Sequence, residues 1–333
     1  MRKKTSKLSG KASEVKQNLT LGDHVHTIIQ SQYQQIIKYE KKVLADQDPE
    51  DLHRMRVATR RLRTALQVFR ETIILPKSAS EKRLSGLAKV LGKLRDLDVQ
   101  IADLENNYRL QLDANEQDIV DEAIAVLQKH RLKAFADVKS ALKRSHYQSL
   151  KSAYHNWLEN PQYTAIAPLL LSPIIPDLLS PLLASLLLHP GWLIAADQVS
   201  AENSPMLHDL RKACKRARYQ AEFFIDFYPK SFQKWANEIK AIQDDLGKLQ
   251  DTEVLRSLLL SKLSAKNQAR LETVIQQTQA EALSTWETTR QKYLKPGFRL
   301  NLHQMLLEPL STLPTQLSDI SGAEVGDLIA LAK

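Results

Sequence analysis

The feature of this sequence that most constrains its fold is an internal repeat. The stretch HRMRVATRRLR begins at His53, and the stretch HDLRKACKRAR begins at His208, 155 residues later. In both stretches a basic residue follows the histidine by three, seven, eight and ten positions. A match of this kind predicts that the same local structure occurs twice in the chain.

A second pair of matching stretches has the same separation. The sequence LGKLRD at 91–96 corresponds to LGKLQD at 246–251, and an acid followed by valine comes two residues after each of them. No insertion therefore separates the two motifs within either half. We infer that the chain has two structurally similar halves that arose by duplication.

Apolar residues recur with the period of an α-helix through most of the chain. Glycine is scarce, at 9 of 333 residues, and this disfavours a β-sandwich or barrel. We predict helices at 20–45, 49–72, 79–106, 113–158, 164–188, 205–228, 231–262 and 266–293. Because four of them fall in each half, the sequence predicts an all-α fold with two similar halves of about four helices each.

The ends of the chain differ from this helical body. Residues 1–18 are basic and polar, without the apolar run of a signal peptide, and we expect a disordered tail there. The helical domain is expected over 19–300, with its halves at 19–160 and 161–300. For 301–333 we expect a tail with short helices.

One segment is apolar enough to raise the question of a membrane span. Leu178 to Ala196 contains no Asp, Glu, Lys or Arg, which is nearly the length that a bilayer requires. Pro181 and Pro190 interrupt it, so we expect a buried helix and no membrane span. The single cysteine, Cys214, excludes an intrachain disulfide and indicates a reducing, cytoplasmic compartment.

The net charge of +9 predicts an anionic partner but does not choose among nucleic acid, a membrane and a phosphate polymer. At about 100° per residue, the bases of each repeat form a stripe beside the apolar face of the helix, not opposite it. The first stripe is His53, Arg56, Arg60 and Arg63, and the second is His208, Arg211, Lys215 and Arg218.

Like charges stacked along one helix destabilise it, so an anion should compensate them. Asp98 and Glu253 are expected on the apolar faces of their own helices, where each needs a guanidinium partner. One acid per half cannot neutralise three or four bases, and the surplus predicts an external polyanion. Each stripe rises about 15 Å, which suits several consecutive phosphates, and arginine binds phosphate oxygens in pairs.

Together the two stripes would form a basic central groove or pore. Lys82, Lys89 and Lys93 share one helix face, and the sequence does not decide whether that face lines the groove or meets solvent. For the two histidines we favour contact with the ligand over a role in fixing the start of the helix. A metal site is disfavoured, since too few ligands lie at close spacing.

The pattern H-x-x-R-x-x-x-[RK]-R-x-R, followed by L-G-x-x-R-D-x-D-V in two halves, resembles the CHAD family (conserved histidine α-helical domain) over roughly 16–300. The resemblance implies an all-α domain of two pseudo-symmetric four-helix bundles around a basic central groove or pore. It also implies binding of inorganic polyphosphate, association with polyphosphate granules, no catalysis and no cofactor. The polyphosphate-binding residues are expected to be His53, Arg56, Arg60, Arg63, Lys93, Arg95, His208, Arg211, Lys212, Lys215, Arg218 and Lys248. Compared with the family, the sequence is expected to be a stand-alone CHAD protein, without the triphosphate-tunnel domain of some relatives.

The sequence departs from this family pattern in its second half. Gln250 stands where Arg95 stands in the first half, and Thr252-Glu253 replaces Leu97-Asp98. We therefore expect the second half to contribute less charge to the groove.

Three other functions were weighed against polyphosphate binding. Binding to a nucleic-acid backbone would use the same phosphate chemistry, but the stripes contain no aromatic or amide side chains for stacking or base readout. A polyphosphate-processing enzyme would need carboxylates to hold Mg²⁺ or a positioned nucleophile. In a purely structural bundle, the basic residues would all be paired internally.

Overall fold

The computed structural model describes residues 18–111, 114–200, 202–259 and 265–310, and it confirms the all-α fold class. The predicted tails at 1–18 and 301–333 lie largely outside these residues. The helices are α2 (Leu21–Ala45), α3 (Pro49–Val68), α4 (Glu81–Asp103), α5 (Ala114–Lys143), α6 (Ser145–Glu159), α7 (Leu171–Leu187), α8 (Ser204–Ala221), α9 (Lys230–Leu259), α10 (Ala265–Leu283), α11 (Trp286–Leu294) and α12 (Pro296–Leu307).

Two predicted helices each prove to be a pair of helices. The helix expected at 113–158 is interrupted at Arg144, whose ψ of 148° is extended, so that α5 ends and α6 begins there. The helix expected at 266–293 is divided into α10 and α11 by a turn before Trp286. The following helix, α12, continues past residue 300, where we expected the helical domain to end.

Two predicted helices are shorter than expected because their ends bind each other. The amide of Ile74 donates to the carbonyl of Gln162, and that of Thr164 donates to the carbonyl of Thr72. These backbone bonds end α3 at Val68 and delay the start of α7 to Leu171. The prediction that Pro181 interrupts the apolar segment is wrong, since α7 continues through it and ends at Leu187.

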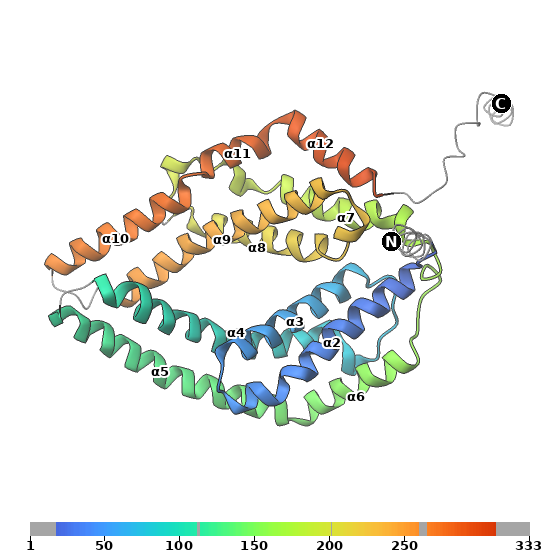
Figure 1. The fold of residues 1–333 in the computed structure, drawn as a ribbon, viewed down its shortest axis with the longest axis horizontal. Coiled ribbons are helices and arrows are strands. Elements are labelled where there is room, and N and C mark those ends of the chain that lie inside the picture. The colour runs from blue at the N-terminus through green and yellow to red at the C-terminus, as the bar shows by residue number, and fades with distance from the viewer. Residues whose placement is uncertain (1–17, 112–113, 201, 260–264, 311–333) are drawn as a thin grey trace, which may run out of the picture.

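The helices form two groups that pack against each other (Figure 1). Helices α2 to α6 form the lower group in this view, and α7 to α12 form the upper one. Helix α3 packs between α2 and α4, and α8 packs against α7 and α9. The two groups meet where α3 contacts α8, and the ring centroids of Phe69 and Phe224 lie 5.9 Å apart at the ends of these two helices.

The core faces predicted for the two basic helices are confirmed. Met55, Leu62, Leu66 and Phe69 are buried in one helix and its end, and Leu210, Ala217, Ala221 and Phe224 are buried in the other. A second, smaller apolar cluster joins α4 and α5 to α9 and α10, and it includes Leu104 and Leu255. The two groups of helices are therefore held together at two separate places. Within the part of the chain that the structure describes, no helix is both long and apolar enough to cross a membrane.

Candidate functional site

The two basic helices begin at matching places in the repeat. Helix α3 starts at Pro49, and the preceding Asp48 accepts a hydrogen bond of 2.8 Å from the amide of Glu50. Helix α8 starts 155 residues later at Ser204, also with a proline in its first turn. A proline is well tolerated in the first turn because the amide it lacks would have no partner there. These starts place His53 and His208 in the second turn of their helices.

A cavity of about 440 Å³ lies between the two groups of helices, and we call it the basic cavity. Its basic side chains come from α3, α4 and α8, and Leu104 and Leu255 of the smaller apolar cluster line it as well. It is lined by His53, Arg56, Arg95, Asp96, Val99, Gln100, Asp103, Leu104, His208, Arg211, Lys215, Gln250, Asp251, Val254 and Leu255. The structure thus brings together six of the predicted binding residues from both repeats.

Lys215 is the most perturbed cation of the cavity. Burial, together with repulsion from Arg60, Arg56, Arg211 and Arg218, lowers the pKa of its ammonium group to about 7. Lys215 forms no ion pair with a carboxylate among the described residues. A partly buried, unpaired lysine among arginines is costly for the fold, and such perturbed groups gather at functional sites.

Arg211 and Arg56 occupy equivalent places but have different partners. The Nη2 of Arg56 lies 3.1 Å from Oδ1 of Asp96, and only 17% of the Arg56 side chain is exposed. Arg211 has no ion pair within the described chain, and its buried Nε has no hydrogen-bond partner. Asp251, the counterpart of Asp96 in the second half, forms no ion pair among the described residues; burial raises its pKa, and attraction to Arg211 opposes that rise.

Tyr219 contacts one arginine from each basic helix. Its ring is buried, its hydroxyl accepts a hydrogen bond of 3.4 Å from Nη1 of Arg60, and the Cζ of Arg60 lies 5.9 Å from the ring centroid. The Cζ of Arg218 lies 4.5 Å from the same centroid. Because cations are attracted to aromatic rings, Tyr219 holds these two guanidinium groups close together despite their like charge.

The glycines of the second motif allow the arginines of the first motif to approach. A Cβ placed on Gly92 would lie 3.6 Å from Nε of Arg56, and one placed on Gly247 would lie 3.2 Å from Nε of Arg211. The guanidinium groups therefore rest against the bare backbone of α4 and α9. The two motifs of each repeat meet in space as well as in sequence.

Both repeated histidines reach the cavity. Burial is the main cause that lowers the pKa of His53 and His208, and nearby bases, such as Arg95 for His53 and Lys212 for His208, lower it further. The buried Nδ1 of His208 has no hydrogen-bond partner. Each imidazole is therefore available as a hydrogen-bond donor to a ligand.

Other predicted binding residues lie outside the lining of the basic cavity. Arg63 pairs with Glu81, and Arg218 lies 3.4 Å from Glu222 in addition to its contact with Tyr219. The exposed lysines each pair with a nearby acid: Lys93 with Asp137, Lys212 with Asp209, and Lys248 with Asp245. Lys212 and Lys248 are not among the residues that line the basic cavity, and Lys93 lines a different cavity.

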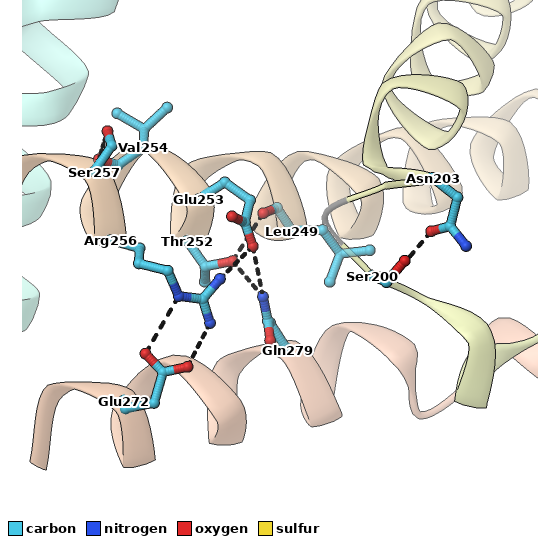
Figure 2. A network of polar contacts seen from close by, with 10 residues as sticks. All are labelled: Ser200, Asn203, Leu249, Thr252, Glu253, Val254, Arg256, Ser257, Glu272 and Gln279. Carbon is cyan, nitrogen blue, oxygen red and sulfur yellow. Dashed lines mark hydrogen bonds and ion pairs between the residues drawn. The ribbon is translucent and has the colours of Figure 1, made fainter. Parts of the chain in front are cut away.

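The expectation that Asp98 and Glu253 need guanidinium partners is correct, but the partners are not in the basic stripes. Asp98 accepts a 2.7 Å hydrogen bond from Nε of Arg131 on α5, whose other nitrogens bind Asp46. Glu253 binds Arg256, which also binds Glu272 on α10 (Figure 2). These acids stabilise the packing of the helices, and the stripes keep their surplus charge.

The cavity also contains acids that sequence reasoning did not assign to it. Asp96, Asp103 and Asp251 line it, and two of them belong to the repeated second motif. That repetition was the signal that could have identified them. Each half contributes two basic side chains besides its histidine to the lining, Arg56 and Arg95 from the first and Arg211 and Lys215 from the second. The number of bases is therefore equal despite Gln250, but the pKa of Lys215 is lowered to about 7, so its charge is only partly present near neutral pH. Among the described residues, no group of three or more His, Cys, Asp or Glu side chains could hold a metal ion.

Known proteins resemble this chain in sequence. The model of the CHAD domain matches residues 27–260. The uncharacterized proteins MT2285 and Rv2226 of Mycobacterium tuberculosis are each 27% identical over 258 residues, covering 74% of this chain and 47% of the relatives. The chain thus spans about half the length of the curated relatives it matches.

Two solved structures resemble the fold. The crystal structure of the CHAD domain from the plant Ricinus communis is 27% identical, covers 87% of this chain and 92% of that chain, and has a TM-score of 0.57. PptA from Streptomyces chartreusis is 15% identical, covers 83% and 99%, and has the same TM-score of 0.57, which shows a likeness in fold alone. Because the family model matches well over half of the sequence, this chain belongs to the CHAD domain family.

Proposed function

We propose that this protein binds inorganic polyphosphate in the basic cavity between α3 and α8. The observation that carries the proposal is the pair Arg211 and Lys215, two cations that line the cavity without an ion pair among the described residues. Their charge is partly buried, and a bound anion would offset the cost of that burial. A chain of phosphates supplies one or more negative charges at each unit.

The arrangement of the cations favours a linear ligand over a single phosphate. His53 and Arg56 approach the cavity from α3, Arg95 from α4, and His208, Arg211 and Lys215 from α8. Arg60 and Arg218 continue the basic surface beyond the lining and meet at Tyr219. Guanidinium groups can each hold two phosphate oxygens, so successive phosphates would be bound by successive residues along the helices.

The same geometry favours polyphosphate over nucleic acid. Proteins that bind single strands stack the bases on exposed aromatic rings. Tyr219 is buried, and guanidinium groups lie near its ring, so it does not offer a stacking platform. Competition by DNA and RNA is therefore included in the test below.

We further propose that the protein is a binding module and not an enzyme, and that it associates with polyphosphate granules in the cytoplasm. Incubation with polyphosphate and Mg²⁺ should release no phosphate above a blank, and sustained turnover would refute the binding-only proposal. A fluorescent fusion should colocalise with granules in cells that accumulate polyphosphate, and a diffuse signal in those cells would contradict the granule assignment.

Binding is tested with fluorescent long-chain polyphosphate at near-physiological salt, in competition with DNA, RNA and pyrophosphate. The wild type is compared with Arg56→Ala/Arg211→Ala, and a melting curve is recorded for each protein. The matched control is Arg54→Ala/Arg216→Ala, which removes two exposed arginines from the same helices. We expect loss of binding only in the first variant, without loss of folding. Equal competition per phosphate by nucleic acid would show a general polyanion surface instead.

A further inference from the structure

A second basic cavity lies on the outer side of α4. It has a volume of about 960 Å³ and is bounded by α4, α5 and the residue between α5 and α6. We call it the α4–α5 groove; its charged and histidine side chains are Lys89, Lys93, Asp96, His130, Lys133, Asp137 and Arg144. Sequence analysis left open whether the lysine face of α4 meets a groove or solvent, and the structure assigns Lys89 and Lys93 to this groove.

The groove and the basic cavity are neighbours across a single helix. Asp96 and Gln100 of α4 line both of them. At Gly92, little more than the backbone of α4 separates the two cavities. Gly92 lines the groove, and Nε of Arg56, which lines the basic cavity, lies 3.6 Å from the position that a Cβ of Gly92 would take. A flexible polymer leaving the basic cavity beside Arg56 therefore reaches the groove by passing over one turn of α4.

The bases of the groove are available to an anion. Lys89, Lys133 and Arg144 are exposed, and none of them forms an ion pair among the residues that the structure describes. Lys93 is only loosely paired, with 3.8 Å between its Nζ and Asp137. At the junction, the charge of Asp96 is already compensated by Arg56.

The second half differs from the first at the matching place on its own helix. Helix α9 carries Asp244 at the position that corresponds to Lys89, 155 residues later. The cavity that adjoins the basic cavity on this side, of about 240 Å³, contains Arg256, but Glu253 and Glu272 already bind that guanidinium (Figure 2). Of these two neighbouring cavities, only the α4–α5 groove is lined by bases without an ion pair among the described residues.

We propose that the α4–α5 groove is a second subsite, which binds the part of a long polyphosphate chain that extends out of the basic cavity. This proposal rests on the proposed function, and it makes long chains bind more tightly than short ones. Tripolyphosphate, which is short enough to remain in the basic cavity, would not use the groove.

The test compares two variants with the same loss of charge. Lys89→Gln/Lys133→Gln/Arg144→Gln removes the unpaired bases of the groove. Lys129→Gln/Lys139→Gln/Lys143→Gln removes three exposed bases of α5 that do not line it. Affinities for long-chain polyphosphate and for tripolyphosphate are measured at several salt concentrations.

We expect the groove variant to bind long chains about tenfold more weakly, with a shallower salt dependence, because fewer phosphates are contacted. Its affinity for tripolyphosphate, and both affinities of the control variant, should be unchanged. An equal loss in the two variants, or an equal loss for long and short chains, would overturn the subsite. If Arg211→Ala binds each ligand as tightly as the wild type does, the proposed function itself fails. That result is distinguishable from failure of the subsite alone.

A footprint provides a measurement that needs no variant. The wild type is acetylated with acetic anhydride, alone or with each ligand, and the modified lysines are quantified by mass spectrometry. Long chains should protect Lys89 and Lys133 severalfold, tripolyphosphate should not, and Lys129 should react alike throughout. Equal reactivity of Lys89 and Lys133 with and without long chains would overturn the proposal.

Discussion

Helices α3 and α8 carry the same pattern of bases, yet the structure uses their charges differently. Arg56 of α3 is paired with Asp96, whereas Arg211 of α8 is without an ion pair in the described chain. At the next repeated position, Arg60 donates to Tyr219, whereas Lys215 has only arginines as charged neighbours of note. A repeated motif thus places charge at equivalent points, and the surrounding acids decide how much of it remains for a ligand.

The largest difference between the halves is expected in stability. Asp98 is 8% exposed and binds Arg131, so Asp98→Ala leaves the half-buried guanidinium of Arg131 with Asp46 alone and should cost about 3 kcal/mol. Glu253→Ala removes a more exposed partner of Arg256, which keeps Glu272, and should cost about 1 kcal/mol. Urea unfolding of both variants measures the difference, and equal costs would contradict the description of Asp98 as the tighter link.

The second difference concerns binding. Arg211→Ala should weaken polyphosphate affinity by about 10- to 100-fold, the size of one or two charge-assisted hydrogen bonds. Arg56→Ala should cost several times less, because Asp96 already engages part of that guanidinium. Titration of the two variants beside Arg216→Ala makes the comparison. A greater loss from Arg56→Ala would reverse the roles that we give the two helices.

A third test uses pH to isolate Lys215. Its pKa is about 7 in the free protein, and a bound anion raises it, so binding takes up a proton between those two values. Affinity should therefore fall above pH 7, by at most about tenfold per pH unit for one proton. Lys215→Arg keeps the charge at all these values and should make the affinity flat from pH 7 to 9. A persistent slope in that variant would exclude Lys215 as its source.

The histidines should act at lower pH than Lys215. The pKa values of His53 and His208 lie below the usual 6.5, and a bound anion raises them, so affinity should increase as pH falls below that value. Asp251, whose pKa is raised, also becomes neutral in acid and would add to this trend. The variant His53→Gln/His208→Gln should lose most of the increase between pH 6.5 and 5.5, and an unchanged profile would exclude the two histidines as its source.

The smallest effect is expected from making α3 resemble α8. Asp96 is 63% exposed, and its replacement in Asp96→Asn frees Arg56 from its carboxylate partner. Because exposed ion pairs contribute little, affinity should rise only about two- to fivefold. Calorimetric titration can resolve a change of this size. A decrease in affinity would show that Asp96 orients Arg56 for the ligand.

Much of this architecture follows from local sequence. Helix period and glycine scarcity predict the fold class, and prolines near 49 and 205 mark the starts of the two basic helices within a residue. The core faces of these helices follow from spacing alone, as Met55 and Leu210 illustrate. Sequence could not predict the break at Arg144, since no glycine or proline marks it and only tertiary packing makes that residue extended.

The pairing of charges was the part that sequence could not supply. Asp98 finds Arg131 on a helix 33 residues away, and Arg61 and Arg218 share Glu222, which no spacing rule connects to the first repeat. Such pairs depend on how helices from distant parts of the chain are packed. They determine which bases stay available, and a list of bases from sequence is therefore longer than the set that lines the cavity.

The close approach of an arginine to the backbone at Gly92 and Gly247 makes substitutions in the two motifs depend on each other. Glycine within a helix costs about 1 kcal/mol relative to alanine. At these two positions it lowers the stability of the helix but leaves room for the arginine side chain. Since a Cβ on Gly247 would lie only 3.2 Å from Arg211, a change at either residue alters what the other can tolerate. Among related sequences, the glycine of the second motif and the first arginine of the first motif should therefore vary together, as one inherited unit in each half.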